Sequence, residues 1–267
     1  MTQLQAAVFD WAGTVIDHGS LAPMGVFVKT IAQFGVAITI PEARGPMGMA
    51  KRDHIKVLMT QPRIAAAWAA AQGAAPDDAA IDKVYAIFVP MNEEAVADFA
   101  TMIEGAVPAI NRLRARGMKI GSTTGYTRSI MARVLPLAAA QGYGPDNLVC
   151  AGDLPMGRPS ALMMYRTFSD LAVGPAHAVV KVDDTPVGIA EGLNAGSWTV
   201  GIALTGNAFG LTPADTAALS PAAFTQKRAA AYAEMTRSGA HYVIETVADI
   251  DAVIDDIEGR LARGDRP

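Results

Sequence analysis

The sequence predicts an α/β fold, a doubly wound parallel sheet with an inserted helical cap domain. Three observations support this prediction. Short apolar runs recur along the chain, small or polar residues follow each run, and helical stretches separate most of the runs. Apolar runs of this length are typical of strands buried on both faces, as in parallel sheets, and the alternation with helices predicts crossovers between the strands.

Five strands are expected, each ending in residues suited to a loop. They lie in the segments LQAAVFDWAG, MKIGSTTGY, NLVCAGD, HAVVKVDDT and SWTVGIAL. Because ligands of doubly wound sheets bind at the carboxyl ends of the strands, polar residues at these ends are candidates for a functional site. The candidates are Asp10, Thr123, Thr124, Asp183 and Asp184.

The stretch between the first and second expected strands is too long for a single crossover helix. Apolar residues recur in it at helical intervals, in the segments GVFVKTIAQFGV, MAKRDHIKVLM, RIAAAWAAAQ and AAIDKVYAIFVPMNEEAVADFA. We therefore predict two domains, a core of residues 1–17 and 102–267 and a helical cap of residues 18–101 above the sheet edge.

Composition and charge exclude several classes of function. The net charge of −4 argues against nucleic acid as a partner, because such binders carry a basic excess on one face. No apolar stretch reaches the roughly 20 residues of a membrane span and no signal peptide is recognisable, so we expect no membrane partner and a cytoplasmic location. The single cysteine, Cys150, excludes a disulfide framework and a cysteine-rich zinc site, and its apolar neighbours favour a buried structural thiol.

Asp10 ends the first expected strand and is followed by Trp-Ala-Gly-Thr. A carboxylate in this position can attack a phosphorus atom while nearby backbone amides receive the phosphorus-bound oxygens. The alternative is that Asp10 caps the next helix, which is a common use of Asp. Taken alone, this acid favours the capping role.

Two further sequence segments shift the preference for Asp10 from helix capping to catalysis. The segment STTGYTR, residues 122–128, follows a strand and opens a helix, so its hydroxyls and amides either hold phosphate-type oxygens or cap the helix. In the segment KVDDT, the adjacent acids Asp183 and Asp184 raise each other's proton affinity, and a magnesium ion would relieve that cost. Together with Asp10, these elements favour catalysis.

With these elements in this order, the sequence resembles the haloacid dehalogenase-like (HAD-like) phosphotransferases, and within them the phosphonoacetaldehyde hydrolase, or phosphonatase, family. The resemblance covers nearly the whole chain and implies a Rossmann-type core with an inserted cap. Phosphatases of this superfamily usually have a second Asp that protonates an alcohol leaving group, and here its place is taken by Ala12. The absence of that acid suits a reaction in which carbon leaves.

The resemblance also implies how carbon is made to leave. Lys51, in the segment RGPMGMAKRDH, matches the lysine that forms an imine with the substrate aldehyde. The imine supplies an electron sink while Asp10 attacks phosphorus, and the resulting aspartyl phosphate is hydrolysed by water. The products would be acetaldehyde and orthophosphate. Burial against Met47 and Met49, or a nearby cation, would help Lys51 to lose its proton, whereas the alternative is a solvated helix lysine.

Other roles follow from the same resemblance. His54, one turn beyond Lys51, would support proton transfers, although a lone helical His is more often structural. Arg158 would neutralise the phosphonyl oxygens, for which its planar fork is suited, and the alternative is an arginine of a surface loop. Thr124 matches the hydroxyl residue of the second motif. The residues expected to contact the substrate are Met47, Gly48, Gly125 and Tyr126.

The expected cofactor is Mg²⁺, held by the carboxylates of Asp10 and Asp184 and by the backbone carbonyl of Ala12. The family usually has Gly-Asp before Thr and a further Asp four places on, whereas this chain has Asp183-Asp184 and then Gly188. We expect Asp183 to be a compensating acid. A second departure is Ser20, which stands where the family often has Cys.

The resemblance implies a small-molecule phosphonate aldehyde as substrate and a homodimer joined through the cap. One alternative is a superfamily phosphatase or phosphomutase that acts on a phosphate ester, with Lys181 as the basic residue and Lys51 only structural. Ala12 argues against it. Another alternative is a catalytically silent binding protein, which the set of Asp10, Thr124, Arg158 and Asp184 argues against.

Overall fold

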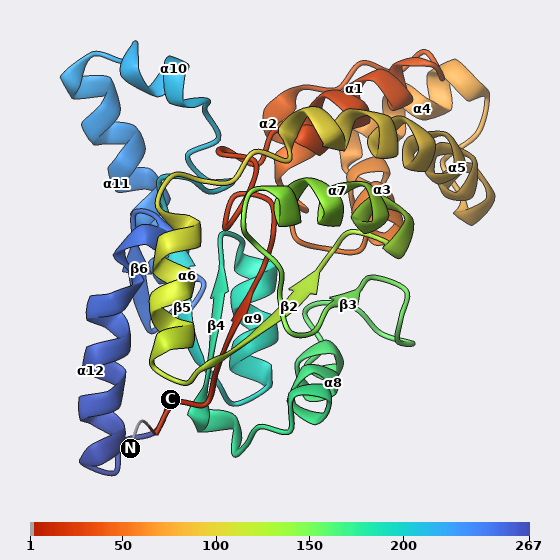
Figure 1. Ribbon diagram of the computed structural model, residues 1–267. Helices are drawn as coiled ribbons and strands as arrows, with labels where there is room; N and C mark the ends of the chain where they lie inside the picture. The colour runs from red at the N-terminus through yellow and green to blue at the C-terminus, as the bar shows by residue number, and fades with distance from the viewer. Residues whose placement is uncertain (1–2) are drawn as a thin grey trace.

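The computed structural model describes residues 3–267, in which six parallel strands form one sheet (Figure 1). The strands are β1 (Ala6–Phe9), β2 (Lys119–Thr124), β3 (Val149–Cys150), β4 (Val179–Asp183), β5 (Trp198–Ile202) and β6 (Tyr242–Ile244). The first five confirm the strands expected from the sequence. The sixth was not predicted, because it is short and two of its three residues are only half-buried at the sheet edge.

The strand order is β3-β2-β1-β4-β5-β6, so the order reverses between β1 and β4. In sheets of this Rossmann-type order, a crevice opens outside the carboxyl ends of the two strands at the reversal. Asp10 directly follows β1, and Asp183 ends β4. The topology therefore brings the nucleophile candidate and the acid pair to the same point of the sheet edge.

Helices cover both faces of the sheet (Figure 1). One face packs against α6 (Ala106–Ala115), α7 (Arg128–Ala140) and α12 (Ile250–Ala262), and the other against α8 (Leu162–Leu171), α9 (Pro186–Asn194) and α11 (Pro221–Arg237). Because successive strand residues point to opposite faces, Phe9 joins the first layer and Val8 the second. The shorter elements of the core are η2 (Ala176–Ala178), α10 (Pro213–Ala217) and η3 (Val247–Asp249).

The inserted segment forms a helical cap over the sheet edge, at the upper right of Figure 1. Its elements are α1 (Ala22–Ala32), α2 (Ile40–Arg44), α3 (Lys51–Met59), α4 (Pro62–Gln72), α5 (Asp78–Ala95) and η1 (Val96–Phe99). The four expected helices correspond to α1, α3, α4 and α5, whereas α2, of five residues, was not predicted. The cap has its own cluster of buried side chains, separate from that of the sheet. The predicted boundaries remain a prediction, since the sheet cluster also includes Ala22, Val96 and Ala100 of the predicted cap segment, and residues 1–2 lie outside the described part of the core.

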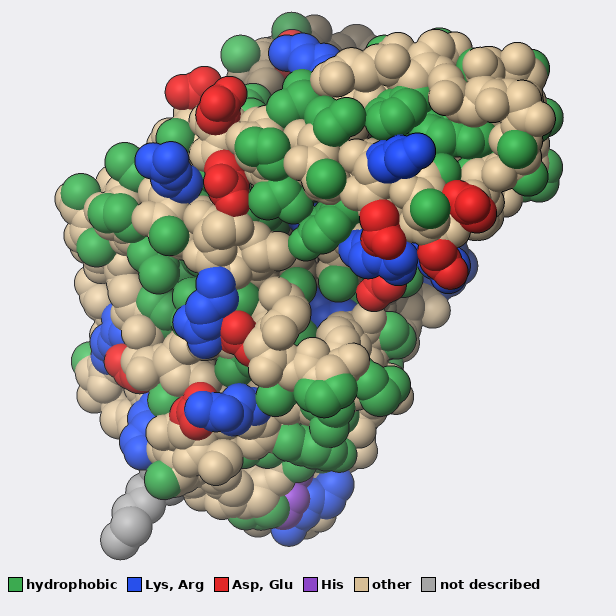
Figure 2. Space-filling model, turned by 90° about the vertical axis from the view of Figure 1, so that its right-hand side faces the viewer, with side chains coloured by type: hydrophobic (Ala, Val, Ile, Leu, Met, Phe, Trp, Pro, Cys, Tyr) green, Lys and Arg blue, Asp and Glu red, His purple; other side chains and the backbone are tan. Residues whose placement is uncertain are grey.

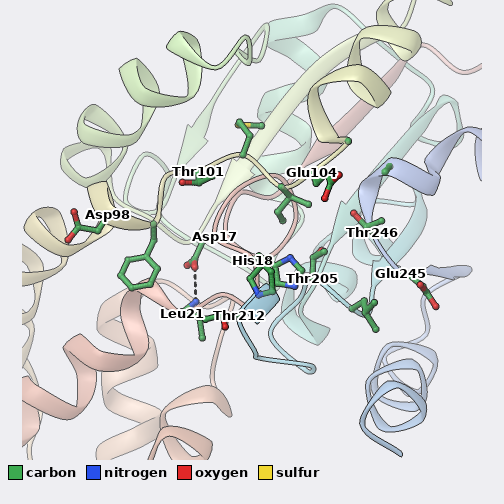
Figure 3. A pocket seen from close by; sticks show the side chains of 17 residues that line it. Asp17, His18, Leu21, Asp98, Thr101, Glu104, Thr205, Thr212, Glu245 and Thr246 are labelled. Carbon is green, nitrogen blue, oxygen red and sulfur yellow. Dashed lines mark hydrogen bonds between the residues drawn. The ribbon is translucent and has the colours of Figure 1, made fainter. Parts of the chain in front are cut away.

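A large cavity lies where the chain passes between core and cap (Figure 3). Its volume is about 760 Å³, and its lining includes Asp17 and Leu21 from the first crossing and Phe99 and Met102 from the second. None of the predicted catalytic residues belongs to this lining. Size alone therefore does not locate the chemistry of this protein.

Within residues 3–267, no helix combines the length and the apolar character needed to cross a membrane.

Candidate active site

A small cavity lies where the cap meets the carboxyl edge of the sheet. Its volume is about 20 Å³, close to the space of one water molecule, so the cap is closed on the core. A larger ligand can enter only if the cap opens. The residues that line the cavity are Asp10, Ala12, Ser20, Met47, Gly48, Lys51, Thr124, Gly125, Tyr126, Arg158, Asp184 and Thr185. This lining contains the whole predicted site except His54 and Asp183.

Asp10 is buried at the end of β1, with 6% of its surface exposed. Its backbone N–H donates to the carbonyl of Val182, and its Oδ1 accepts a hydrogen bond from Nη1 of Arg158 at 2.8 Å. Burial raises the pKa of Asp10 to about 6, with a further increase from Asp183 that Arg158 only partly offsets. The helix-capping alternative does not hold, because the next helix begins only at Ala22.

Lys51 is the first residue of α3 and is also buried, with 3% of its surface exposed. Its Nζ lies 5.1 Å from the ring centroid of Tyr126 and 5.9 Å from that of Phe27. It also lies 3.8 Å from the sulfur of Met47. Burial lowers the pKa of Lys51 to about 8, although Asp10 acts in the opposite direction. The alternative of a solvated lysine is therefore wrong, and a substantial fraction of the amine is neutral near physiological pH.

His54 is buried within the cap, one turn from Lys51. Its Nε2 lies 2.8 Å from the carbonyl oxygen of Ala43, and its ring stacks on Phe27 with centroids 4.0 Å apart. Burial, reinforced by Lys51, holds the pKa of His54 well below its usual value, so the ring is neutral and Nε2–H donates to the carbonyl. Nδ1 has no hydrogen-bond partner among the described residues. His54 lies outside the cavity lining, and its role in proton transfer stays a prediction.

Arg158 joins the cavity to a buried ionic network. Its side chain is 1% exposed, and besides Asp10 it contacts Oδ2 of Asp183 at 3.3 Å and Oε2 of Glu191 at 3.0 Å. The alternative of a surface-loop arginine is therefore wrong. With one end of its fork fixed by Glu191 and the other directed at Asp10, the guanidinium is held beside the nucleophile candidate.

Lys181 lies below this layer rather than in the cavity. Its Nζ contacts Asp183 and Glu191, each at 3.1 Å, and donates to Oγ1 of Thr123 at 2.7 Å. Since Lys181 is fully buried and absent from the described lining, the phosphatase alternative that gives it the phosphate contact loses support. Sequence reasoning missed Glu191, and the only available signal was an acid inside the apolar helical run GIAEGLN.

Three carboxylates gather at the bottom of the site. One oxygen each from Asp10, Asp183 and Asp184 lies within 4.8 Å of the others, an arrangement that can hold a metal ion. Burial, together with Asp10 and Asp183, raises the pKa of Asp184 well above its usual value. Burial also acts to raise the pKa of Asp183, but Arg158 and Lys181 outweigh it and leave the pKa below its usual value. A negative charge is therefore least stabilised at Asp184, beside Asp10, and oxygen ligands of this kind fit a divalent cation.

The structure explains why Asp183 and Gly188 occur together. A Cβ atom at Gly188 would lie 2.0 to 2.2 Å from the carboxylate atoms of Asp183, which no real contact allows. The carboxylate of Asp183 thus occupies the space that a side chain at position 188 would need. It is held there by the backbone N–H and hydroxyl of Thr185, at 3.0 and 2.8 Å. The role of Asp183 as a compensating acid stays a prediction.

Gly188→Ala should therefore destabilise the protein. The new methyl group must displace Asp183 from its hydrogen bonds and ion pairs, and overpacking of this kind costs about 1–3 kcal/mol of unfolding free energy. Gly25→Ala is the matched control, because Gly25 also lies in a helix and a Cβ there meets nothing within 4 Å. Urea unfolding of both variants tests the expectation. Equal stability of the two would show that Asp183 yields without cost.

Ser20 also lies at the cavity, at the position where the resembled family often has Cys. It is 1% exposed, and its hydroxyl has no hydrogen-bond partner among the described residues. Thr124 lines the cavity too, and its Oγ1 accepts a hydrogen bond from the N–H of Tyr126 at 3.1 Å. The segment that carries Thr124 is therefore fixed by its own turn.

Comparison with known proteins places this chain in a family. A model of the haloacid dehalogenase-like hydrolases matches residues 4–196. The chain is 56% identical to the phosphonoacetaldehyde hydrolase of Paraburkholderia xenovorans, over the full length of both chains. It is 46% identical to that of Bordetella avium, covering 99% of this chain and 95% of the relative.

Solved structures agree. A phosphonoacetaldehyde hydrolase-like protein from Oleispira antarctica superposes with a TM-score of 0.97 at 42% identity, covering 99% of this chain and 96% of the other. A β-phosphoglucomutase from Clostridium difficile has a TM-score of 0.68 at 13% identity, which shows the shared fold alone. The chain therefore belongs to the haloacid dehalogenase-like hydrolases and, within them, to the phosphonoacetaldehyde hydrolase family.

Proposed function

We propose that this protein hydrolyses the carbon–phosphorus bond of phosphonoacetaldehyde, through an imine at Lys51 and an aspartyl phosphate at Asp10. One observation carries the proposal. A buried amine with a pKa of about 8 and a buried carboxylate line the same small cavity, although they come from different domains. At the position of the phosphatase acid stands Ala12, which cannot protonate an alcohol.

The reaction follows from these groups. The neutral amine of Lys51 attacks the aldehyde carbon, and loss of water gives a protonated imine. Asp10 then attacks phosphorus, and the electron pair of the carbon–phosphorus bond moves into the imine to give an enamine. Protonation and hydrolysis of the enamine release acetaldehyde and free Lys51. Water hydrolyses the aspartyl phosphate to orthophosphate and restores Asp10.

Arg158 supports the phosphoryl step. Its guanidinium already donates to Asp10, so oxygens on a phosphorus atom attacked by Asp10 would lie within its reach. We propose that Asp10, Asp184 and the carbonyl of Ala12 hold Mg²⁺, which would neutralise charge on the carboxylates and on the substrate. Asp183 is tied to Thr185, Arg158 and Lys181, which suits an orienting role behind the ion.

The predicted substrate contacts lie at the closest approach of cap and core. A Cβ atom at Gly125 of the core would come within 2.7 Å of the carbonyl oxygen of Met49, and one at Gly48 of the cap within 2.3 Å of Oγ1 of Thr185. Backbone therefore meets the opposite domain directly at both glycines. With Met47 and Tyr126 beside Lys51, these residues form the walls within which we propose that the aldehyde is held.

A product assay tests the proposal. Purified protein with phosphonoacetaldehyde and Mg²⁺ should release acetaldehyde and orthophosphate in equal amounts, and removal of divalent cations with EDTA should stop both. The phosphatase alternative predicts phosphate release from small phosphate esters without an aldehyde product. That result would overturn the proposal.

The pH dependence should report Lys51. Because kcat/KM follows the ionisations of the free enzyme, it should fall about tenfold per pH unit as the pH decreases below about 8, where the amine is protonated and cannot attack. Steady-state rates at low substrate concentration measure this. A profile that stays flat from about pH 8 down to the ionisation of Asp10, about pH 6, would contradict the proposed role of the amine.

We also propose a cytoplasmic homodimer joined through the cap. Figure 2 shows apolar side chains on the cap surface, and the cap residues Ile40 and Val57 are each 41% exposed. Apolar surface of this kind is available for association. Sedimentation equilibrium should give twice the chain mass of 27.8 kDa, and a shift to monomer in Val57→Glu would locate the contact on this domain.

A further inference from the structure

Arg44, the last residue of α2, connects the closed cap to the core through its guanidinium. Nη1 donates to the carbonyl of Asn207 at 3.2 Å and to its side-chain Oδ1 at 3.0 Å, and Nη2 donates to the carbonyl of Gly210 at 3.1 Å. Nη1 also donates to the carbonyl of Gly19, in the first connection between the domains, at 2.9 Å. The side-chain Nδ2 of Asn207 donates in return to the backbone carbonyl of Arg44 at 3.4 Å. One cap side chain thus contacts both the hinge and the core.

The core side of this contact is built for close approach. Gly210 has a φ of +63°, and a Cβ atom there would lie 2.7 Å from the central carbon of the guanidinium. Asn207 is 6% exposed in the closed structure. Glycine is therefore required for the backbone to lie against Arg44, and the contact is not an accidental meeting of surfaces.

The same loop also reaches the active site. The backbone N–H of Asn207 donates to Oδ2 of Asp184 at 2.7 Å. A chain of direct contacts therefore runs from Arg44 in the cap, through Asn207, to the carboxylate of Asp184. Movement of the loop would alter this hydrogen bond to Asp184.

We propose that Arg44 and Asn207 form a latch that holds the cap closed and couples its closure to the orientation of Asp184. Entry to the 20 Å³ cavity requires the cap to open, so the latch must break and reform in each catalytic cycle. Since Lys51 lies seven residues after Arg44 in the same segment, a closed latch also sets the buried amine over the sheet edge. Arg44 is on this account a positioning residue, because it lies outside the cavity lining.

The test measures cap opening directly. Spin labels at Lys83→Cys in the cap and Ser169→Cys in the core, both exposed positions, report the distance between domains, while the native Cys150 is buried. Arg44→Met should increase the open population about tenfold, because several charge-assisted hydrogen bonds are lost together. Gly210→Ala should act in the same direction without changing the arginine. Circular dichroism confirms that each variant is folded.

The matched control is Arg63→Met. Arg63 is a cap arginine that also contacts α2, but its partners, Glu42 and Ala37, belong to the cap itself. The Arg63→Met variant should show the same distribution of distances between the two domains as the wild type. If Arg44→Met and Gly210→Ala also leave it unchanged, the latch is refuted. No substrate is present, so this outcome does not depend on the proposed reaction.

The coupling to Asp184 is tested separately with Mg²⁺ alone. Because coupling is reciprocal, Mg²⁺ should shift the wild-type distances toward the closed state, and Arg44→Met should weaken Mg²⁺ binding in calorimetry by a factor of about ten. A variant that opens the cap but binds Mg²⁺ as tightly as the wild type would overturn the coupling and leave the latch. In steady-state assays, loss of the latch should lower kcat/KM while Arg63→Met does not.

Discussion

Lys51→Arg should abolish carbon–phosphorus cleavage while keeping the positive charge at this position. Arginine stays protonated and cannot form an imine, so the electron pair leaving phosphorus has no acceptor. We expect kcat to fall by about 10⁴-fold or more, the scale of losing a covalent catalytic group. Acetaldehyde release measures the loss. Borohydride in the presence of substrate should label the wild type at Lys51 and leave the variant unlabelled.

Two further variants make this result specific. Lys51→Met removes both the amine and the charge with a side chain of similar length, and it should be as inactive as Lys51→Arg if the imine is what matters. Lys56→Arg is the matched control, since Lys56 lies on the same helix but is exposed and pairs with Asp78 at 2.9 Å. It should retain full activity. Residual cleavage in Lys51→Arg would show that a cation suffices and that no imine forms.

Much of the site could be predicted because its residues follow recognisable strands. Asp10, Thr124 and Asp184 each follow or end an apolar run, and parallel topology brings such positions to one edge. Lys51 could be placed only by resemblance, since helical periodicity alone leaves a lysine at the start of a helix in solvent. Its burial results from contact between two domains, which no local pattern describes.

What the sequence did not indicate depends on pairing between distant segments. Glu191 meets Arg158 and Lys181 only in the folded core, where an acid inside an apolar helix finds two buried cations. Arg44 and Asn207 are 163 positions apart, and neither belongs to a periodic pattern. Short elements such as β6 and α2 were missed for a different reason, because three to five residues are too few to show a period.

Asp10→Asn should separate the two halves of the proposed reaction. The amide is nearly the same size as the carboxylate but cannot form an aspartyl phosphate, so we expect orthophosphate release to fall by about 10⁴-fold or more. Lys51 is untouched, and borohydride should still trap the substrate imine. Both variants should lose cleavage, so the trapping of the imine is what distinguishes Asp10→Asn from Lys51→Arg. Loss of trapping in both variants would mean that imine formation needs the carboxylate, contrary to the order of steps proposed here.

Stability provides an independent check on Asp10. Its pKa is raised to about 6 in the folded protein, chiefly by burial, so the ionised carboxylate opposes folding above that pH. Without divalent cations at pH 8, neutral Asn should therefore raise the melting temperature, and the difference from the wild type should shrink as the pH decreases through about 6 and Asp10 takes up its proton. A variant that is more stable yet inactive would identify Asp10 as a group kept for chemistry at a cost to the fold. A lower melting temperature would instead mean that the ion pair with Arg158 outweighs the burial of the charge.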